Sequence, residues 1–211
     1  MKKECAVFVA FCLGAVAQVA ASLIPIPLVN SGFEDGPPPS PTDPIPGWPD
    51  VGTTNSAGVE FGSAHSGDYS ASLLSGTATS ERGIYQMTDY TIQEDDVFTL
   101  RFWSTITWEN GEITAVLFYG NGNADNPAYE IGSETNVPPG DWWSGTWTEF
   151  ELTVTATPES VGQKLGVQFL NTGTPDGSWV ALDDVTLSVV PEPATIALLG
   201  LGILFVLHKR R

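Results

Sequence analysis

The carboxyl side chain of Asp183 is the first candidate for chemistry in this sequence. It lies in an apolar run, and alternation along a strand would place it on one face with Ala181, Val185 and Leu187. A carboxylate that points into an apolar interior is costly unless it is hydrogen-bonded or binds a hard cation such as Ca²⁺, which prefers oxygen ligands. The pattern therefore predicts a compensated carboxylate, with capping of a turn as the alternative role.

Tryptophans beside polar groups form a second candidate site. Trp103 falls on the polar face of its expected strand, next to Arg101, and a turn that contains glycine carries Trp142, Trp143 and Trp147. An aromatic face beside hydrogen-bonding groups is a surface on which a sugar ring stacks. Closure of a sandwich core is the alternative role of such tryptophans. The expected ligand-binding residues are Arg101, Trp103, Trp142 and Trp143.

Few residues outside the two ends are suited to catalysis. Cys5 and Cys12 both lie in the N-terminal apolar stretch, His65 is the single histidine of the body, and no Gly-x-Ser-x-Gly motif is present. His65 lies in a Ser-Gly turn, where a turn or packing role is expected and a zinc site lacks partners. We therefore expect a protein that is not an enzyme. A glycoside hydrolase with two catalytic carboxylates is the less favoured alternative.

The charge balance of the chain indicates which kinds of binding partner are disfavoured. The chain carries 25 acidic residues against 8 basic ones, a formal net charge of -17. Between residues 22 and 190 the only basic residues are Arg82, Arg101 and Lys164. This excess disfavours nucleic acid and anionic lipid surfaces and favours solubility or divalent cations.

The elements that must position these side chains are β-strands. Hydrophobic and polar residues alternate with period two in several windows, and Gly, Pro, Asn or Asp separate them, whereas no amphipathic helix is evident. Strands at this spacing without helices predict one all-β domain of two packed antiparallel sheets over residues 22–189. The expected strands cover 59–61, 69–74, 83–87, 98–103, 112–119, 149–154, 164–169 and 179–189.

The N-terminus has the three parts of a secretory signal peptide. Lys2 and Lys3 precede an apolar stretch at 5–17, and small residues follow up to Ala21. We expect residues 1–21 to direct export and to be removed.

The C-terminus combines a motif, an apolar run and a basic cluster. Pro191, Glu192 and Pro193 precede residues 194–207, and Lys209, Arg210 and Arg211 end the chain. A helix over the run would span about 21 Å, less than the ~30 Å hydrocarbon core, but the basic cluster fits a cytoplasmic flank. We therefore expect a single transmembrane helix in segment 190–211, with the rest of the chain outside.

This tail resembles the PEP-CTERM sorting signal of bacteria in the kind, order and position of its three parts. The resemblance implies recognition by an exosortase, a membrane enzyme that removes the tail. Pro191, Glu192, Pro193 and the basic residues 209–211 would then be recognition elements. The implied route leads from the inner membrane to the cell surface or an exopolysaccharide matrix.

Short motifs in the body are similar to those of carbohydrate-binding modules with a galactose-binding-like jelly roll. They lie at 30–34, 46–48, 65–70 and 182–185. The resemblance implies a jelly-roll β-sandwich, often with a structural Ca²⁺ where the first and last strands meet. It also implies the metal ligands, which would be Glu34 with Asp183 or Asp184 and nearby backbone carbonyls.

Together these features predict an exported, PEP-CTERM-sorted protein that binds a glycan without catalysis. Its expected partners are an exosortase, an extracellular polysaccharide and the membrane. A purely structural surface protein without a specific ligand is the alternative.

Overall fold

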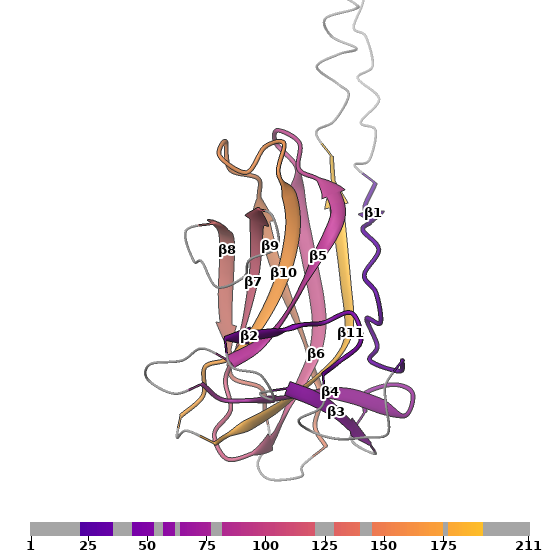
Figure 1. Ribbon diagram of the computed structural model, residues 1–211, viewed down its shortest axis with the longest axis vertical. Coiled ribbons are helices and arrows are strands. Elements are labelled where there is room, and N and C mark those ends of the chain that lie inside the picture. Colours follow the sequence, from indigo (N-terminus) through magenta and orange to yellow (C-terminus); the bar gives the residue numbers. More distant parts are fainter. Residues whose placement is uncertain are drawn as a thin grey trace, which may run out of the picture.

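The computed structural model describes residues 22–35, 44–52, 57–61, 64–76, 82–120, 129–139, 145–174 and 177–191. Within these ranges all regular elements that bear on the site are β-strands (Figure 1). The strands are β1 (Ile24–Pro25), β2 (Asp50–Gly52), β3 (Ala57–Phe61), β4 (Tyr69–Leu74), β5 (Arg82–Thr91), β6 (Val97–Trp108), β7 (Ile113–Gly120), β8 (Glu130–Asn136), β9 (Thr148–Thr155), β10 (Lys164–Asn171) and β11 (Trp179–Val190).

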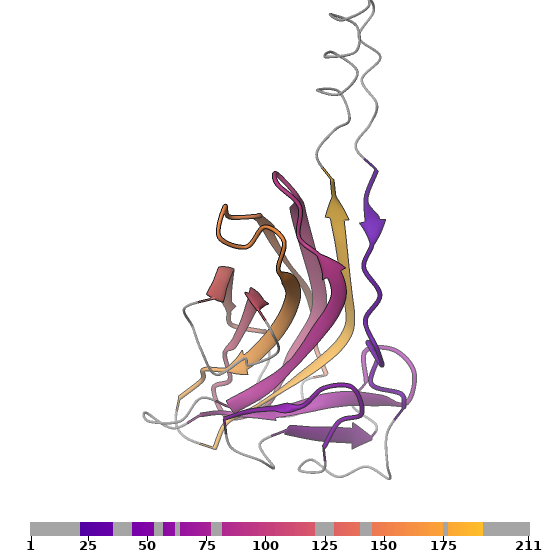
Figure 2. The same ribbon diagram turned by 45° about the horizontal axis from the view of Figure 1, so that its top comes forward.

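The strands form two antiparallel sheets. One has the order β3-β4-β11-β6-β9 with β1 beside β11, and the other has the order β2-β5-β10-β7-β8. Figure 2 shows the long strands of both sheets as curved layers that enclose the core. The predicted all-β architecture of two antiparallel sheets is confirmed.

The expected end segments lie outside the described residues. This holds for the signal peptide at 1–21 and for the apolar run and basic cluster of the tail. In the part of the chain that the structure describes, no helix is long and apolar enough to cross a membrane.

Aromatic side chains dominate the core between the sheets. Phe102 of β6 packs against Phe169 of β10 with ring centroids 5.0 Å apart, and against Phe150 of β9 at 5.6 Å. Trp48 is fully buried, and its indole Nε1–H donates to the backbone oxygens of Val29 and Asn30. Because truncation of a buried Phe to Ala costs about 3–5 kcal/mol, these rings carry much of the stability.

A β-bulge in β11 changes which residues face this core. From the Asp183–Trp103 pair to the Thr186–Arg101 pair, β11 advances by three residues and β6 by two. Asp184, in the bulge, has a φ of 49°, which is the left-handed region. The core face of β11 therefore consists of even-numbered residues before the bulge and odd-numbered ones after it, namely Val180, Leu182, Val185, Leu187 and Val189.

Because of the bulge, the predicted orientation of the Asp183 side chain was wrong. Strict alternation put its carboxylate on the core face with Val185, but its cross-strand partner is Trp103, which lies on the outer face next to Arg101. Side chains of directly paired residues share a face. Asp183 is fully buried as expected, but it is buried on the outer side of the sheet, under a loop.

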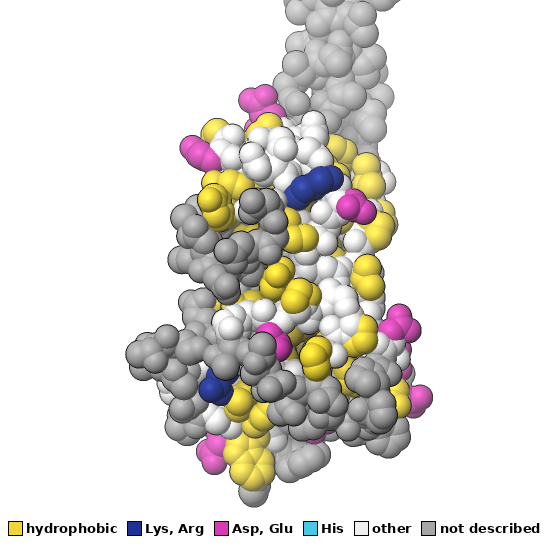
Figure 3. Space-filling model, viewed as in Figure 1, with side chains coloured by type: hydrophobic (Ala, Val, Ile, Leu, Met, Phe, Trp, Pro, Cys, Tyr) yellow, Lys and Arg dark blue, Asp and Glu magenta, His cyan; other side chains and the backbone are white. Residues whose placement is uncertain are grey.

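The other sheet carries a small apolar cluster on its outer face. Tyr85 meets Phe118 edge-on at 6.4 Å, and the Phe118 ring lies so close to Gly166 that an added Cβ would come within 2.3 Å of it. Figure 3 shows apolar side chains on this side of the molecule and few basic ones, consistent with the acidic composition. The cluster consists of Val51, Val116, Phe118 and Leu170, with Tyr85 and Met87 packed against them.

Candidate functional site

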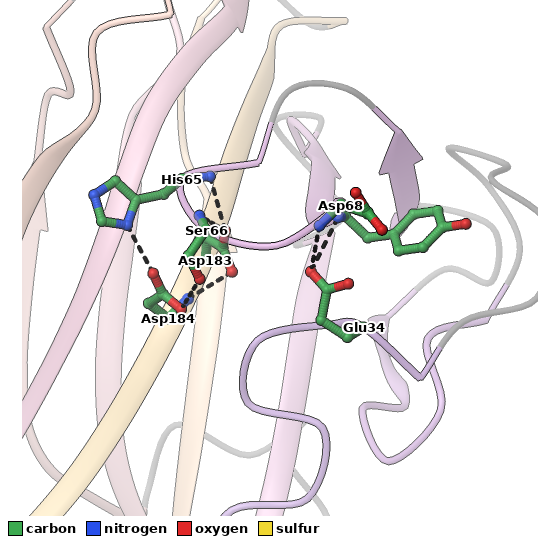
Figure 4. A network of polar contacts seen from close by, with 7 residues as sticks. Glu34, His65, Ser66, Asp68, Asp183 and Asp184 are labelled. Carbon is green, nitrogen blue, oxygen red and sulfur yellow. Dashed lines mark hydrogen bonds and ion pairs between the residues drawn. The ribbon is translucent and has the colours of Figure 1, made fainter.

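The candidate site lies on the outer face of the β3-β4-β11-β6-β9 sheet, where the loop of residues 65–68 covers β11. The loop is held by the side chain of Asp183 (Figure 4). Asp183 Oδ2 accepts the backbone N–H groups of His65 at 2.8 Å and Ser66 at 3.1 Å, while its Oδ1 accepts the N–H of Asp184 at 2.7 Å. The expected compensation of this buried carboxylate is therefore supplied by three backbone donors.

Burial shapes the acidity of this group. Loss of solvent raises the pKa of Asp183 to about 6, since the three N–H donors offset desolvation only in part and the nearby Asp184 adds repulsion. The carboxyl group therefore titrates close to neutral pH.

Asp184 holds the side chains of the same loop. Its Oδ2 lies 2.7 Å from Nδ1 of His65, and its Oδ1 accepts the hydroxyl of Ser66 at 2.7 Å. The bulge makes this possible, because the left-handed conformation of Asp184 lets two consecutive carboxylates of β11 meet one loop. The His65 and Asp184 side chains stay partly exposed, at 28% and 31%.

Glu34 holds the other end of the loop. Its Oε1 accepts the backbone N–H groups of Asp68 and Tyr69, both at 3.0 Å. Gly67 has a φ of 67°, and a Cβ there would lie 2.2 Å from Oε1 of Glu34. Only glycine therefore fits the turn while Glu34 keeps both hydrogen bonds.

The imidazole of His65 joins two tryptophans into an aromatic cluster, defined as His65, Trp103 and Trp147. His65 stacks on Trp103 with ring centroids 3.8 Å apart and an interplanar angle of 11°. It meets Trp147 edge-on at 5.9 Å. Trp103 is paired with Glu149 of the neighbouring strand β9 and with Asp183 of the neighbouring strand β11. Carboxylates therefore flank the cluster on both sides within the sheet.

The structure places the predicted site residues unevenly around this cluster. Glu34, Asp183 and Asp184 meet the 65–68 loop, and Trp103 lies in the cluster. Arg101 is on the same face, where its Nε donates to Glu151 at 2.7 Å in an exposed pair. Trp142, Trp143 and the tail residues from Glu192 to Arg211 lie outside the described residues.

Glu34 and Asp183 or Asp184 were expected to bind Ca²⁺ through their carboxylates. Ca²⁺ requires several oxygens around one point. The N–H and O–H groups of the 65–68 loop instead occupy oxygens of all three carboxylates, and the described residues contain no group of three or more His, Cys, Asp or Glu side chains suited to a metal ion. As arranged here, the set does not fit a shared metal site, and calcium binding stays a prediction.

Sequence reasoning missed the part played by His65. Its contacts with Asp184 span 119 positions of sequence, so no local spacing reveals them. The one signal that could have indicated this contact is that His65 and Asp184 lie in two of the short motifs, at 65–70 and 182–185, that are similar to those of carbohydrate-binding modules.

Comparison with known proteins identifies the tail and the fold. Residues 189–211 match the PEP-CTERM protein-sorting motif, so the predicted sorting signal is confirmed. No curated protein matches the chain significantly. Three similar solved structures are each less than 25% identical to it, and their likeness shows the fold alone.

One similar structure is a cyclase from Fischerella sp. TAU, with 21% identity, a TM-score of 0.64, and coverage of 81% of this chain and 98% of that chain. The CBM22-1 xylan-binding domain of Paenibacillus barcinonensis Xyn10C has 15% identity and a TM-score of 0.53, covering 82% and 97%. TmCBM61 in complex with β-1,4-galactotriose has 20% identity and a TM-score of 0.51, covering 77% and 97%. The expected likeness to jelly-roll carbohydrate-binding modules is confirmed.

Proposed function

We propose that this PEP-CTERM-sorted protein binds an extracellular glycan at the aromatic cluster, without catalysis. The observation that carries the proposal is the stack of His65 on Trp103 beside two carboxylates on an otherwise polar sheet face. Aromatic rings pack against the C–H faces of a sugar, and adjacent polar groups exchange hydrogen bonds with its hydroxyls. The likeness to a xylan-binding domain and to a module bound to galactotriose supports this class of ligand.

The charge of the chain favours a neutral glycan. Asp184 and Glu149 lie at the cluster, and the chain as a whole has a formal charge of -17. A polyanionic polysaccharide would meet like charges at this surface, which disfavours its binding.

The fold by itself does not choose between binding and catalysis, because cyclases and carbohydrate-binding modules share it. The proposal therefore depends on the cluster. The sorting tail supports its biological side, since an exosortase would deliver the domain to the surface or to a polysaccharide matrix, where a glycan ligand is available.

The test is binding of neutral polysaccharides to wild-type protein and to Trp103→Ala. Loss of the indole removes the stacking surface, and we expect binding to weaken about tenfold or more, which corresponds to about 1.4 kcal/mol. Trp108→Ala is the matched control, because Trp108 is a partly exposed tryptophan of the same strand outside the cluster. Equal retention of wild type and Trp103→Ala on a glycan array, with both proteins folded, would contradict the proposal.

A further inference from the structure

The imidazole of His65 is held in one orientation before any ligand arrives. Its ring lies flat on Trp103, meets the edge of Trp147 and contacts Asp184 through Nδ1 at 2.7 Å. Its backbone N–H is fixed by Asp183 at 2.8 Å. A side chain constrained from so many directions loses little further freedom on binding, which favours recognition.

Asp184 also determines which ring nitrogen carries the hydrogen. A carboxylate only accepts hydrogen bonds, so the 2.7 Å contact places the hydrogen of the neutral imidazole on Nδ1. The carboxylate is itself fixed by the hydroxyl of Ser66, and the backbone N–H of Asp184 is fixed by Asp183. The remaining nitrogen, Nε2, then presents a lone pair.

Nε2 is available for a ligand. Figure 4 shows the ring with this nitrogen directed away from Asp184, and within the described part of the chain Nε2 makes no hydrogen bond. The side chain is 28% exposed, so a molecule outside can reach it. The edge of the aromatic cluster therefore displays one oriented acceptor.

We infer that Nε2 of His65 accepts a hydrogen bond from a hydroxyl group of the sugar bound at the aromatic cluster. The inference rests on the proposed glycan-binding function and names Nε2 of His65 as the group that selects ligands with a hydroxyl donor at this position. A neutral sugar supplies hydroxyl donors around its ring, whereas a ligand that offers only acceptors leaves Nε2 unpaired. A site that is built to hydrogen-bond a ligand hydroxyl discriminates against similar ligands that lack this donor.

The first measurement is the tautomer of His65 in the full chain, read from the ¹⁵N shifts of the imidazole. His208 is the other histidine, and the spectrum of His65→Phe separates their signals. We expect hydrogen on Nδ1 in the wild type and on Nε2 in Asp184→Asn, because the amide can donate to Nδ1. Asp95→Asn is the matched control, since Asp95 is an exposed aspartate that also has positive φ, at 59°. Hydrogen on Nε2 in the wild type would overturn the inference.

The second measurement is binding of β-1,4-galactotriose and a xylan oligosaccharide by calorimetry. We expect His65→Phe, which keeps a ring over Trp103, and Asp184→Asn each to weaken binding about tenfold, with Asp95→Asn unchanged. If Trp103→Ala loses binding while His65→Phe and Asp184→Asn bind as the wild type does, the inference fails and the proposed function stands. If the wild type binds neither these two sugars nor any neutral glycan on the array, both the proposed function and the inference fail.

Discussion

The burial of Asp183 links its acidity to folding. The folded state raises the pKa of this group to about 6, above the ordinary aspartate value of about 3.9, so the folded protein binds the proton more tightly than the unfolded chain. The stabilisation that results is fully present below about pH 4 and is lost as the pH rises through about 6.

We expect Asp183→Asn to remove this pH dependence. Between pH 4 and pH 7 the wild type should lose up to about 3 kcal/mol of unfolding free energy through Asp183, since each pKa unit is about 1.4 kcal/mol. Urea denaturation of both proteins at the two pH values measures the effect, because contributions of all other groups are common to them. The same change with pH in wild type and variant would contradict the assignment.

Gly67 is the residue that lets Glu34 hold the loop. In Gly67→Ala the new Cβ would come 2.2 Å from Oε1 of Glu34, and we expect the carboxylate to leave the N–H groups of Asp68 and Tyr69. Gly162→Ala is the control for backbone strain, since Gly162 has a φ of 81° and nothing within 4 Å of an added Cβ.

Gly67→Ala should therefore destabilise the fold by about 1 kcal/mol more than Gly162→Ala does, the scale of one hydrogen bond. Chemical denaturation of the two variants makes the comparison. Equal destabilisation would mean that Glu34 does not hold the loop.

At the scale of strands, Gly83 of β5 leaves no room for a side chain against the backbone of β10. A Cβ at this position would lie 1.9 Å from the backbone oxygen of Phe169 in β10. Neither strand can move aside alone, so we expect Gly83→Ala to destabilise the protein by about 3 kcal/mol, at the upper end of overpacking effects. Thermal or urea unfolding tests this against Thr91→Ala, at the exposed end of the same strand. Stability close to that of the control would contradict the close approach.

Alternation foretold most of the long strands but not the position of Asp183. The expected runs at 98–103 and 149–154 lie within β6 and β9, where more buried and more exposed residues alternate, because a strand with one face in the core repeats every two residues. The short strands β1 and β2 and the strand β8 have little burial pattern and were missed. The bulge at Asp184 broke the period of β11, and no local pattern of residue types marks a bulge of this kind.

The structure brings the predicted acids and Trp103 to the 65–68 loop and its histidine, but in a geometry that the sequence did not predict. Glu34 and Asp183 were expected around a metal ion, whereas both accept backbone hydrogen bonds of the 65–68 loop. Which donor reaches a carboxylate depends on contacts across 34 positions for Glu34 with Asp68 and 118 positions for Asp183 with His65, and alternation carries no information on those.

At the scale of the whole molecule, the tail can be altered without changing the domain, so its role in sorting can be tested separately. β11 ends at Val190, so deletion of residues 191–211 leaves every described strand intact. We expect this deletion to move the protein from the membrane fraction to the medium. Substitution of Pro191, Glu192 and Pro193 by Ala, Gln and Ala keeps the apolar run and should leave the protein in the membrane with an uncut tail. Cell fractionation with intact-mass measurement distinguishes these outcomes, and an unchanged distribution of the deletion variant would contradict sorting by the tail.

The pairing of β1 with β11 brings Ile24 opposite Val189, so that the chain enters and leaves the domain side by side (Figure 1). The 65–68 loop, between β3 and β4, lies toward the end of the domain opposite to Ile24 and Val189 in both ribbon views. If the tail holds the domain at a bilayer, as the sorting motif implies, the 65–68 loop would lie away from that bilayer, and removal of the tail would take place far from a bound glycan. The proposed glycan binding and the removal of the tail would then be spatially separate, so that the domain could leave the membrane while it is still bound to a polysaccharide.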